Sequence, residues 1–302
     1  MKVHGLLLLD KPLGLSSNVA LQKVRRLLSA DKAGHGGTLD PMASGVLPLM
    51  FGEACKLAGS ALSHDKAYEA EVRFGERTTT DDVEGEVIAR SDARPTAEAL
   101  AAALMRFQGV IEQVPPVYSA LKVGGKAMYR HAREGAPIEA APRQVRVDVI
   151  ELLAFDGERA RLRIDCGKGT YIRSIARDLG EVLGCGAHLS GLRRTRVGAF
   201  DVRDAVPLPA LLDDGPEAAA QHLRGLLHLV AGWPQVVLGP DEAARFGHGQ
   251  AVPAARFLAA EGFAPQAAQV AVLSGGRLLG LGRHGVLPDG APAVLPTRVI
   301  VD

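Results

Sequence analysis

Apolar and charged residues alternate cleanly in residues 67–75, AYEAEVRFG. Side chains two positions apart in a β-strand share one face of the sheet. The alternation therefore predicts a half-buried strand, with Tyr68 at the head of an apolar face that continues through Ala70, Val72 and Phe74. The charged residues between them face the other way.

Helical spacing of apolar residues predicts three helices. Ser16 or Ser17 is expected to cap the first, and the others lie at residues 96–107 and 172–183. The remaining predicted elements are strands at residues 5–9, 145–150 and 159–166, a glycine-rich loop at 32–40, a short helix near 53–62, and a peripheral helix and linker at 201–232.

From residue 235 onward the pattern changes to short β-like pieces. These are QVVL, then QVAVLSGGRLLGLGRHG with a Gly-Gly turn, and finally TRVIVD. Alternating segments joined by glycine turns are typical of small β domains. We therefore expect a β-rich second domain of roughly 70 residues.

Length and composition agree with a globular protein outside the membrane. The 302 residues predict two domains, or one large domain with an appendage. No apolar run approaches the length that crosses a bilayer, and the four leucines at residues 6–9 are too few for a signal peptide. Cys55, Cys166 and Cys185 have no paired or metal-type spacing, so we expect reduced thiols in a cytoplasmic protein.

Positive charge is concentrated in one segment, although the net charge is only +1. Residues 122–198 hold 15 Lys and Arg against 9 Asp and Glu, which leaves 20 against 25 in the remainder. This distribution fits a polyanion-binding face and a solvated surface about equally well.

The glycine-rich loop contains the first candidate chemical group. In GHGGTLDPMASG, Gly34, Gly36 and Gly37 permit close backbone approach to a ligand, and Asp40 follows them. Asp40-Pro41 alone is more often a turn, and His35 more often a surface or capping group. The loop lacks the spacing of a phosphate-binding P-loop, so nucleotide hydrolysis is not supported.

Two other segments carry candidate groups. In KGTYIRSIARDLG, Tyr171 and Arg173 flank the core face of the predicted third helix, and an arginine there either makes a surface ion pair or keeps a buried carboxylate ionised. Residues 112–135 interleave aromatic and basic side chains, which suits either a loop gripping RNA or a proline-stiffened surface hairpin.

Together, seven segments resemble the TruB family of tRNA pseudouridine synthases, in the family's order and over nearly the whole chain. They are LLLLDKPLGLSSN, GHGGTLDPMASGVLPL, KAYEAEVRFG, RTTTDDVEG, QVPPVYSALKVGGKAMYRHAREG, KGTYIRSIARDLG and GAHLSGLRRTRVGAF. The resemblance implies an α+β pseudouridine synthase fold, with a mixed, largely antiparallel central sheet flanked by helices. It also implies a catalytic domain at residues 1–232, with an RNA-gripping insertion at about 112–145, and a PUA-like RNA-binding domain at 233–302.

The resemblance also implies a reaction, the isomerisation of uridine 55 in the T-loop of tRNA to pseudouridine. Asp40 matches the family nucleophile, and Arg173 matches the arginine that pairs with it. Tyr68 matches the tyrosine that stacks on the flipped base and is also a candidate base for the C5 proton, although a phenol with a pKa of about 10 is poorly suited to that. The attack of Asp40 on C1′, its attack on C6 and its removal of a ribose proton all remain open.

Other positions match family residues around the site. His35 matches a histidine that contacts nucleotides near the flipped base, and Tyr171 and Leu192 match residues that line the uridine pocket. Lys11 and Pro12 match a segment that supports the floor of the site. Asp82 matches an acidic position near the pocket, with an alignment uncertain by one residue because of Asp81.

The resemblance implies no cofactor or metal, a tRNA T-arm as partner, and a cytoplasmic monomer with no membrane contact and no guide RNA. Three alternatives remain open: a tRNA-binding and folding chaperone whose catalysis is secondary, a guide-RNA-dependent subunit, and a carboxylate hydrolase. A glycosidase would need a second acid at a set distance from its nucleophile, and Asp82 could be imagined in that role.

Overall fold

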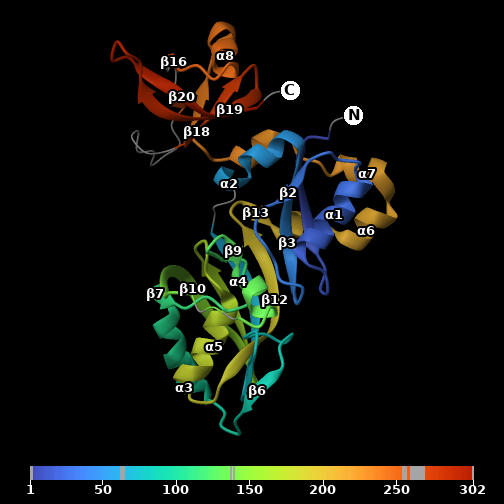
Figure 1. Cartoon of the computed structure of the whole chain (residues 1–302), viewed down its shortest axis with the longest axis vertical. Helices are drawn as coiled ribbons and strands as arrows, with labels where there is room; N and C mark the ends of the chain where they lie inside the picture. The colour runs from blue at the N-terminus through green and yellow to red at the C-terminus, as the bar shows by residue number, and fades with distance from the viewer. Residues whose placement is uncertain are drawn as a thin grey trace.

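The structure is a computed structural model that describes residues 3–61, 65–136, 138, 140–253, 257–258 and 269–300. Two sheets dominate it (Figure 1). The ten strands of the central sheet are β1 (Gly5–Lys11), β2 (Ala33–His35), β3 (Ala43–Phe51), β4 (Lys66–Phe74), β7 (Gly109–Gln113), β10 (Arg143–Phe155), β11 (Arg159–Cys166), β12 (Ala187–Val197), β13 (Phe200–Asp201) and β14 (Val206–Pro207).

The central sheet runs in the order β14-β1-β3-β12-β4-β11-β10-β7, with β13 beside β12 and β2 beside β3. Only the pairs β1–β14 and β3–β12 are parallel among these described strands. The expected mixed, largely antiparallel sheet is therefore confirmed, and with its helices it makes an α+β fold.

Helices cover the two halves of this sheet separately. On one half, α3 (Ala97–Leu104) and α5 (Ile172–Val182) pack on β4, β10, β11 and β12. On the other half, α1 (Ser17–Leu27), α6 (Leu208–Asp213) and α7 (Gly215–Gln221) pack on β1 and β3 (Figure 1). Short 3-10 helices lie at Gly52–Leu57, Met105–Phe107, Val202–Asp204 and Leu226–Val230, and α2 (Ala58–Ala61) follows the first of them.

The second sheet contains β15 (Gln235–Val237), β16 (Val252–Pro253), β17 (Phe257–Leu258), β18 (Gln269–Ser274), β19 (Arg277–Val286) and β20 (Pro292–Val299), in the order β16-β20-β19-β18-β15-β17. Helix α8 (Pro240–Gly247) packs on it through buried Phe246. Leu273 and Leu281 of this sheet share a buried cluster with Leu6 and Leu8 of β1, so the two sheets are joined by an apolar contact.

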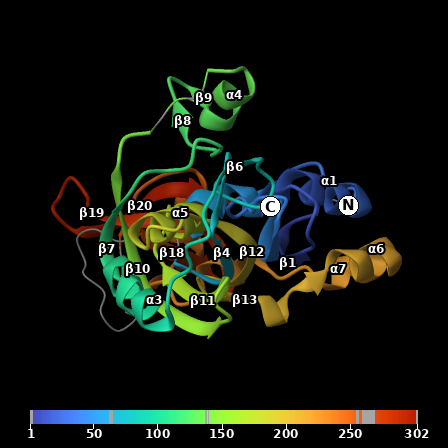
Figure 2. The same cartoon turned by 90° about the horizontal axis from the view of Figure 1, so that it is seen from below.

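Two hairpins extend from the central sheet. The first is β5 (Glu76–Thr78) with β6 (Val87–Arg90). The second is β8 (Lys122–Val123) with β9 (Lys126–Ala127), followed by α4 (Met128–Arg133). This second hairpin belongs to the long connection between the neighbouring strands β7 and β10, and it stands away from the sheet (Figure 2).

The predicted strands at residues 5–9, 67–75, 145–150 and 159–166 are confirmed, as are the helices capped by Ser16 and Thr96. The glycine-rich loop was predicted too long, because its first residues form β2 against β3. The short helix near residues 53–62 begins as a 3-10 helix at Gly52, and its predicted last residue, Leu62, lies outside the described residues. Within the described ranges, no helix is both long and apolar enough to cross a membrane.

Candidate active site

A cavity of about 320 Å³ opens where the loop after β2, strands β4 and β12, and the start of α5 meet. These elements belong to distant parts of the chain, so the fold assembles the cavity from separate motifs. Its lining residues are Gly37, Thr38, Leu39, Asp40, Lys66, Tyr68, Ala120, Gly169, Thr170, Tyr171, Ile172, Arg173, Leu192 and Arg194.

Hydrogen bonds to helix α1 and to the loop after β1 hold Asp40 in place. The Ser17 hydroxyl accepts a hydrogen bond from the Leu39 N–H at 2.7 Å and lies 3.0 Å from the Leu39 carbonyl oxygen. On the other side of Asp40, the Gly14 N–H donates to the Pro41 carbonyl at 2.8 Å. The backbone on both sides of Asp40 is therefore fixed, which aims its carboxylate into the cavity.

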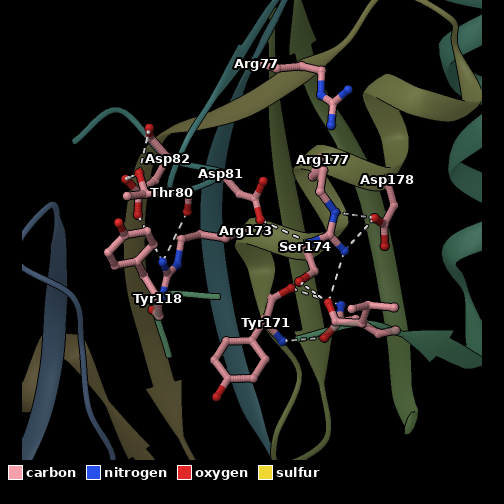
Figure 3. A network of polar contacts seen from close by, with 12 residues as sticks. Arg77, Thr80, Asp81, Asp82, Tyr118, Tyr171, Arg173, Ser174, Arg177 and Asp178 are labelled. Carbon is pink, nitrogen blue, oxygen red and sulfur yellow. Dashed lines mark hydrogen bonds and ion pairs between the residues drawn. The ribbon is translucent and has the colours of Figure 1, made fainter. Parts of the chain in front are cut away.

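Arg173, in the first turn of α5, bridges two carboxylates. Its Nη2 lies 3.1 Å from Oδ2 of Asp40, and its Nη1 lies 3.3 Å from Oδ2 of Asp82. The same two nitrogens donate to the backbone carbonyls of Thr80 and Tyr118 (Figure 3). With a side chain only 6% exposed, Arg173 is thus a fixed cation rather than a mobile surface group.

Burial and charge act on Asp40 in opposite directions. Desolvation raises the pKa of its carboxyl group above the ordinary value, and the nearby Asp82 adds to the rise. The positive charges of Arg173 and Lys11 lower the pKa, with Arg173 the larger influence of the two. Arg173 therefore favours the ionised carboxylate that a nucleophile requires.

The two carboxylates do not form the acid–nucleophile pair of a glycosidase. Asp82 is 3% exposed and does not line the cavity, and its Oδ1 accepts hydrogen bonds from the Thr80 hydroxyl at 2.5 Å and the Glu84 N–H at 3.0 Å. Its other oxygen faces Arg173. Asp82 therefore orients Arg173 and does not reach the space where a substrate would lie.

The start of α5 is tied to the segment that leaves β7. The Gln113 side chain accepts from the Tyr171 N–H at 2.8 Å and donates to the Tyr171 carbonyl at 3.0 Å, and the Ser174 hydroxyl donates to the Val114 carbonyl at 2.8 Å (Figure 3). Together with the bond from Arg173 to Tyr118, these contacts join the base of the hairpin insertion to the arginine beside Asp40.

Tyr68 and Tyr171 give the cavity two aromatic walls. Tyr68 is buried on β4, beside the Arg194 side chain, and burial raises the pKa of its hydroxyl to about 12. Tyr171 lies under the Arg143 guanidinium, 5.1 Å from the ring centroid. With Leu192, these rings offer the flat apolar surfaces on which a base can stack.

Lys11, Pro12 and His35 lie near the cavity, but none of them lines it. Lys11 is fully buried and donates to the carbonyls of Pro12 and Leu15, and desolvation lowers its pKa to about 8. His35 ends β2, and within the described residues its buried Nδ1 has no hydrogen-bond partner. Lys11 and Pro12 thus lie where a supporting role was expected.

Two cationic residues in the cavity wall, Lys66 and Arg194, were not predicted from the sequence. Lys66 begins β4, two residues before Tyr68, and Arg194 is buried on β12. Alternation along β4 could have placed Lys66 on the same face as Tyr68. Arg194 lies in an RRTR run that reads as exposed positive charge, so its burial had no signal in the sequence.

Comparisons with known proteins agree along the whole chain. Residues 25–172 match the family model of the TruB family pseudouridylate synthase N-terminal domain, residues 173–228 that of the tRNA pseudouridylate synthase B C-terminal domain, and residues 234–300 that of the pseudouridine synthase II TruB C-terminal region.

Two relatives illustrate the similarity. The chain is 47% identical over 303 residues to tRNA pseudouridine synthase B of Stutzerimonas stutzeri (strain A1501), a match that spans 99% of this chain and 96% of that protein. It is 50% identical over 302 residues to tRNA pseudouridine synthase B of Cupriavidus metallidurans (strain CH34 and its equivalents), spanning 99% and 94%.

Among solved structures, a chain from a Cbf5-Nop10-Gar1 complex superimposes with a TM-score of 0.76 at 28% identity, covering 99% of this chain and 85% of that one. A chain from an H/ACA RNP bound to a substrate RNA gives a TM-score of 0.75 at 26% identity, covering 99% and 86%. Both similarities extend through the second sheet.

Proposed function

Because the chain belongs to the TruB family of pseudouridylate synthases, we propose that it converts uridine 55, in the T-loop of tRNA, to pseudouridine. Its relatives carry the name tRNA pseudouridine synthase B at 47% to 50% identity over nearly the whole chain, so its reaction is the isomerisation of a tRNA uridine. The observation that carries the assignment of the catalytic group is the Asp40–Arg173 ion pair in the wall of the cavity.

Asp40 acts as the nucleophile in this proposal. A carboxylate can form a reversible adduct with the sugar or the base, which lets the glycosidic bond break and the base reattach through carbon. Burial leaves the pKa of Asp40 above its ordinary value, and the charge of Arg173 offsets part of that rise and so favours the ionised carboxylate. Asp82 fixes Arg173 from the side away from the cavity.

Tyr68 serves mainly as a stacking surface. Extracting the target base from a folded loop costs about a few kcal/mol, and stacking on an aromatic ring offsets about 1–3 kcal/mol of that cost. The pKa of its hydroxyl is raised to about 12, which leaves very little phenolate near neutral pH. A role as the base for the C5 proton is therefore less well supported than the stacking role.

The hairpin insertion and the second sheet hold the rest of the RNA. Tyr129 of α4 lies 5.9 Å from the Arg130 guanidinium and 5.5 Å from that of Arg133, an aromatic–cation group suited to nucleotides and phosphates. We assign residues 1–232 to catalysis, with His35 near the opened loop, and residues 233–302 to a PUA-like RNA-binding domain. The protein acts as a cytoplasmic monomer in this proposal.

The test is an assay of the purified chain on an unmodified tRNA transcript, with no guide RNA added. We expect pseudouridine at position 55 only, and we expect Asp40→Asn to abolish it while tRNA binding is retained. Modification by the Asp40→Asn variant would refute the role of Asp40. Pseudouridine at another position would refute the assignment of uridine 55.

The same assay decides between this proposal and two others. The structural similarity to chains from a Cbf5-Nop10-Gar1 complex and an H/ACA RNP raises the possibility of guide-dependent action. Modification that requires an added guide RNA would favour that function. Refolding of misfolded tRNA by wild type and Asp40→Asn alike, with no modification by either, would favour a chaperone.

A further inference from the structure

Arg194 is a buried cation that has no carboxylate within ion-pair distance among the described residues. It is 1% exposed, and it is the largest side chain in the molecule to be fully buried among those described. Removing a guanidinium from water is costly unless a negative charge compensates it. An unpaired cation in the wall of a catalytic cavity therefore calls for a functional explanation.

The neighbours of Arg194 are neutral or positive. Its Nε donates to the Val46 carbonyl at 2.9 Å, and its Nη atoms donate to the carbonyls of Thr38 and Gly37 at 3.4 and 3.2 Å. Burial is the main cause that lowers the pKa values of Lys11, His35 and Lys66, and the positive charge of Arg194 lowers all three further. This side of the cavity therefore carries an uncompensated positive potential.

The geometry also fixes Arg194 firmly. Strand β12 lies so close to β3 that a Cβ atom on Gly45 would be 2.2 Å from the Arg194 carbonyl oxygen, and Gly45 has a φ of +110°. The guanidinium spans from β3 to the loop that leads to Asp40, and it lies against the Tyr68 side chain. A cation held in this way needs no reorganisation when a negative charge develops nearby.

The proposed reaction places negative charge on the base by every open route. If Asp40 bonds to C1′, the C1′–N1 bond breaks and its electron pair stays with N1. If Asp40 removes the C2′ proton, that C–H pair forms a C1′–C2′ double bond and the base leaves with the same N1 pair. If Asp40 attacks C6, the C5–C6 π pair moves toward the C4 carbonyl oxygen. On this last route the C1′–N1 bond then breaks with its pair on N1. On every route C5 next bonds to C1′ and its proton is released, while N1 takes up a proton. The bond from Asp40 to C1′ or C6 breaks with its pair returning to the carboxylate, or the proton taken from C2′ is returned to it.

We propose that Arg194 stabilises the negative charge that develops on the uracil base when its bond to the ribose is broken. This inference rests on the proposed function and extends it, because it assigns a second buried arginine to the departing uracil base. Arg173 stabilises the attacking carboxylate, and Arg194 stabilises the base that departs and returns. Tyr68 contacts Arg194 and lines the same cavity, so a base stacked on Tyr68 would lie near this cation.

The experiment compares two tRNAs, one with uridine and one with a single 5-fluorouridine at the target position. Fluorine at C5 makes the detached base a more stable anion, so it needs less help from Arg194. The rate of loss of the target nucleoside is measured under single-turnover conditions, because fluorine at C5 blocks the normal product. We expect Arg194→Gln to slow the loss of uridine about 100-fold. The factor by which it slows the loss of 5-fluorouridine should be smaller, by about fivefold or more.

Two further variants separate charge from structure. Arg194→Lys keeps the positive charge and is expected to recover most of the rate, while Arg196→Gln, two residues along β12 where the arginine pairs with Asp165, should slow both substrates by one common factor. If the Arg194→Gln variant does not fold, the rate of Arg194→Lys relative to wild type is measured with both substrates. The slowing by Arg194→Lys should again be smaller for 5-fluorouridine.

Equal slowing of both substrates by Arg194→Gln, or by Arg194→Lys where Arg194→Gln does not fold, would overturn the inference, because a purely structural role affects them alike. The wild-type chain distinguishes this failure from failure of the proposed function. If wild type converts the uridine tRNA but the Arg194 variants show no substrate dependence, only the inference fails. If wild type does not convert it, the proposed function itself is wrong.

Discussion

The two buried arginines of the cavity both donate to backbone carbonyls, but only one of them pairs with carboxylates. Arg173 lies between two carboxylates, Asp40 and Asp82, whereas Arg194 donates to the backbone carbonyls of Gly37, Thr38 and Val46. The first arrangement neutralises a charge that is present before reaction. The second leaves a charge uncompensated until the reaction supplies its partner. The cavity therefore has one wall, at Arg173, that stabilises the nucleophile and a second wall, at Arg194, that stabilises the departing base.

Arg173→Met should have the largest effect on the first wall. Loss of a fixed cation beside a reacting carboxylate is expected to slow the reaction about 100- to 1,000-fold. Because Arg173 lowers the pKa of Asp40, its removal raises that pKa further. The acid limb of the pH profile, where activity falls as Asp40 is protonated, should therefore lie at a higher pH than in wild type. A single-turnover pH profile measures both effects.

The matched control for this prediction is Arg177→Met, one turn further along α5. Arg177 pairs with Asp81 and Asp178, and among the described residues it makes no hydrogen bond or ion pair with Asp40, so the acid limb of its profile should stay in place. Removing Arg173 also leaves Asp82 buried without its cation, which is expected to cost about 3 kcal/mol of unfolding free energy. An unmoved acid limb in folded Arg173→Met would contradict the pairing.

Asp82→Asn should shift the acid limb of the pH profile toward lower pH. The negative charge of Asp82 raises the pKa of Asp40, so the neutral amide lets Asp40 remain ionised to a lower pH. Looser positioning of Arg173 is expected to slow the plateau rate about tenfold, or about 1.4 kcal/mol. Asp178→Asn, which alters only the Arg177 pair, is the control for the loss of one carboxylate from this network. Equal profiles for the two variants would show that Asp82 does not act on Asp40.

Tyr68→Phe probes the link between the two walls. The ring remains for stacking and only the hydroxyl beside Arg194 is lost, so we expect less than about tenfold slowing. A general base would contribute about 100- to 10,000-fold. A loss in that range, measured at the same pH as for wild type, would restore Tyr68 as the proton acceptor and would contradict the stacking role.

The smallest effects are expected far from both walls, in the hairpin insertion. Lys122→Gln and Arg130→Gln should weaken tRNA binding modestly, and each should reduce the slope of log affinity against log salt by about one. Lys23→Gln, on α1 beside the other half of the sheet, should leave the slope unchanged. Filter binding at several salt concentrations measures the slopes. A flat salt profile for wild type would contradict an RNA-binding insertion.

Sequence patterns predicted β4, which has one buried face, and β1, which is buried on both, but they missed β3, which is also buried on both faces. Strand β4 alternates and was found, but β3 was missed because Val46 and Met50 pack on one side of it while Leu47 and Leu49 pack on the other. Its apolar run therefore has no period of two. Strand β12 was missed because its buried positions do not alternate and its last part is rich in arginine.

The residues of the candidate site also fall into those that could be predicted from the sequence and one that could not. Asp40, Tyr68 and Arg173 could be predicted only jointly, through their family resemblance, because the ion pair joins residues far apart in the chain. Arg194 could not be predicted, since its partners are backbone carbonyls that the fold alone brings to it. Every residue carries a backbone carbonyl, so hydrogen bonds to carbonyls cannot be predicted from the types of residue in the sequence.

The proposed function requires Asp40 to face a flipped uridine at the point where its ribose joins its base. This requirement is tested most directly by a crystal structure of the Asp40→Asn chain bound to an unmodified tRNA T-arm. The account predicts that uridine 55 leaves the loop, stacks on Tyr68 inside the cavity and places its ribose beside residue 40. A uridine that remains stacked in the loop, or one bound with its ribose away from residue 40, would contradict the account.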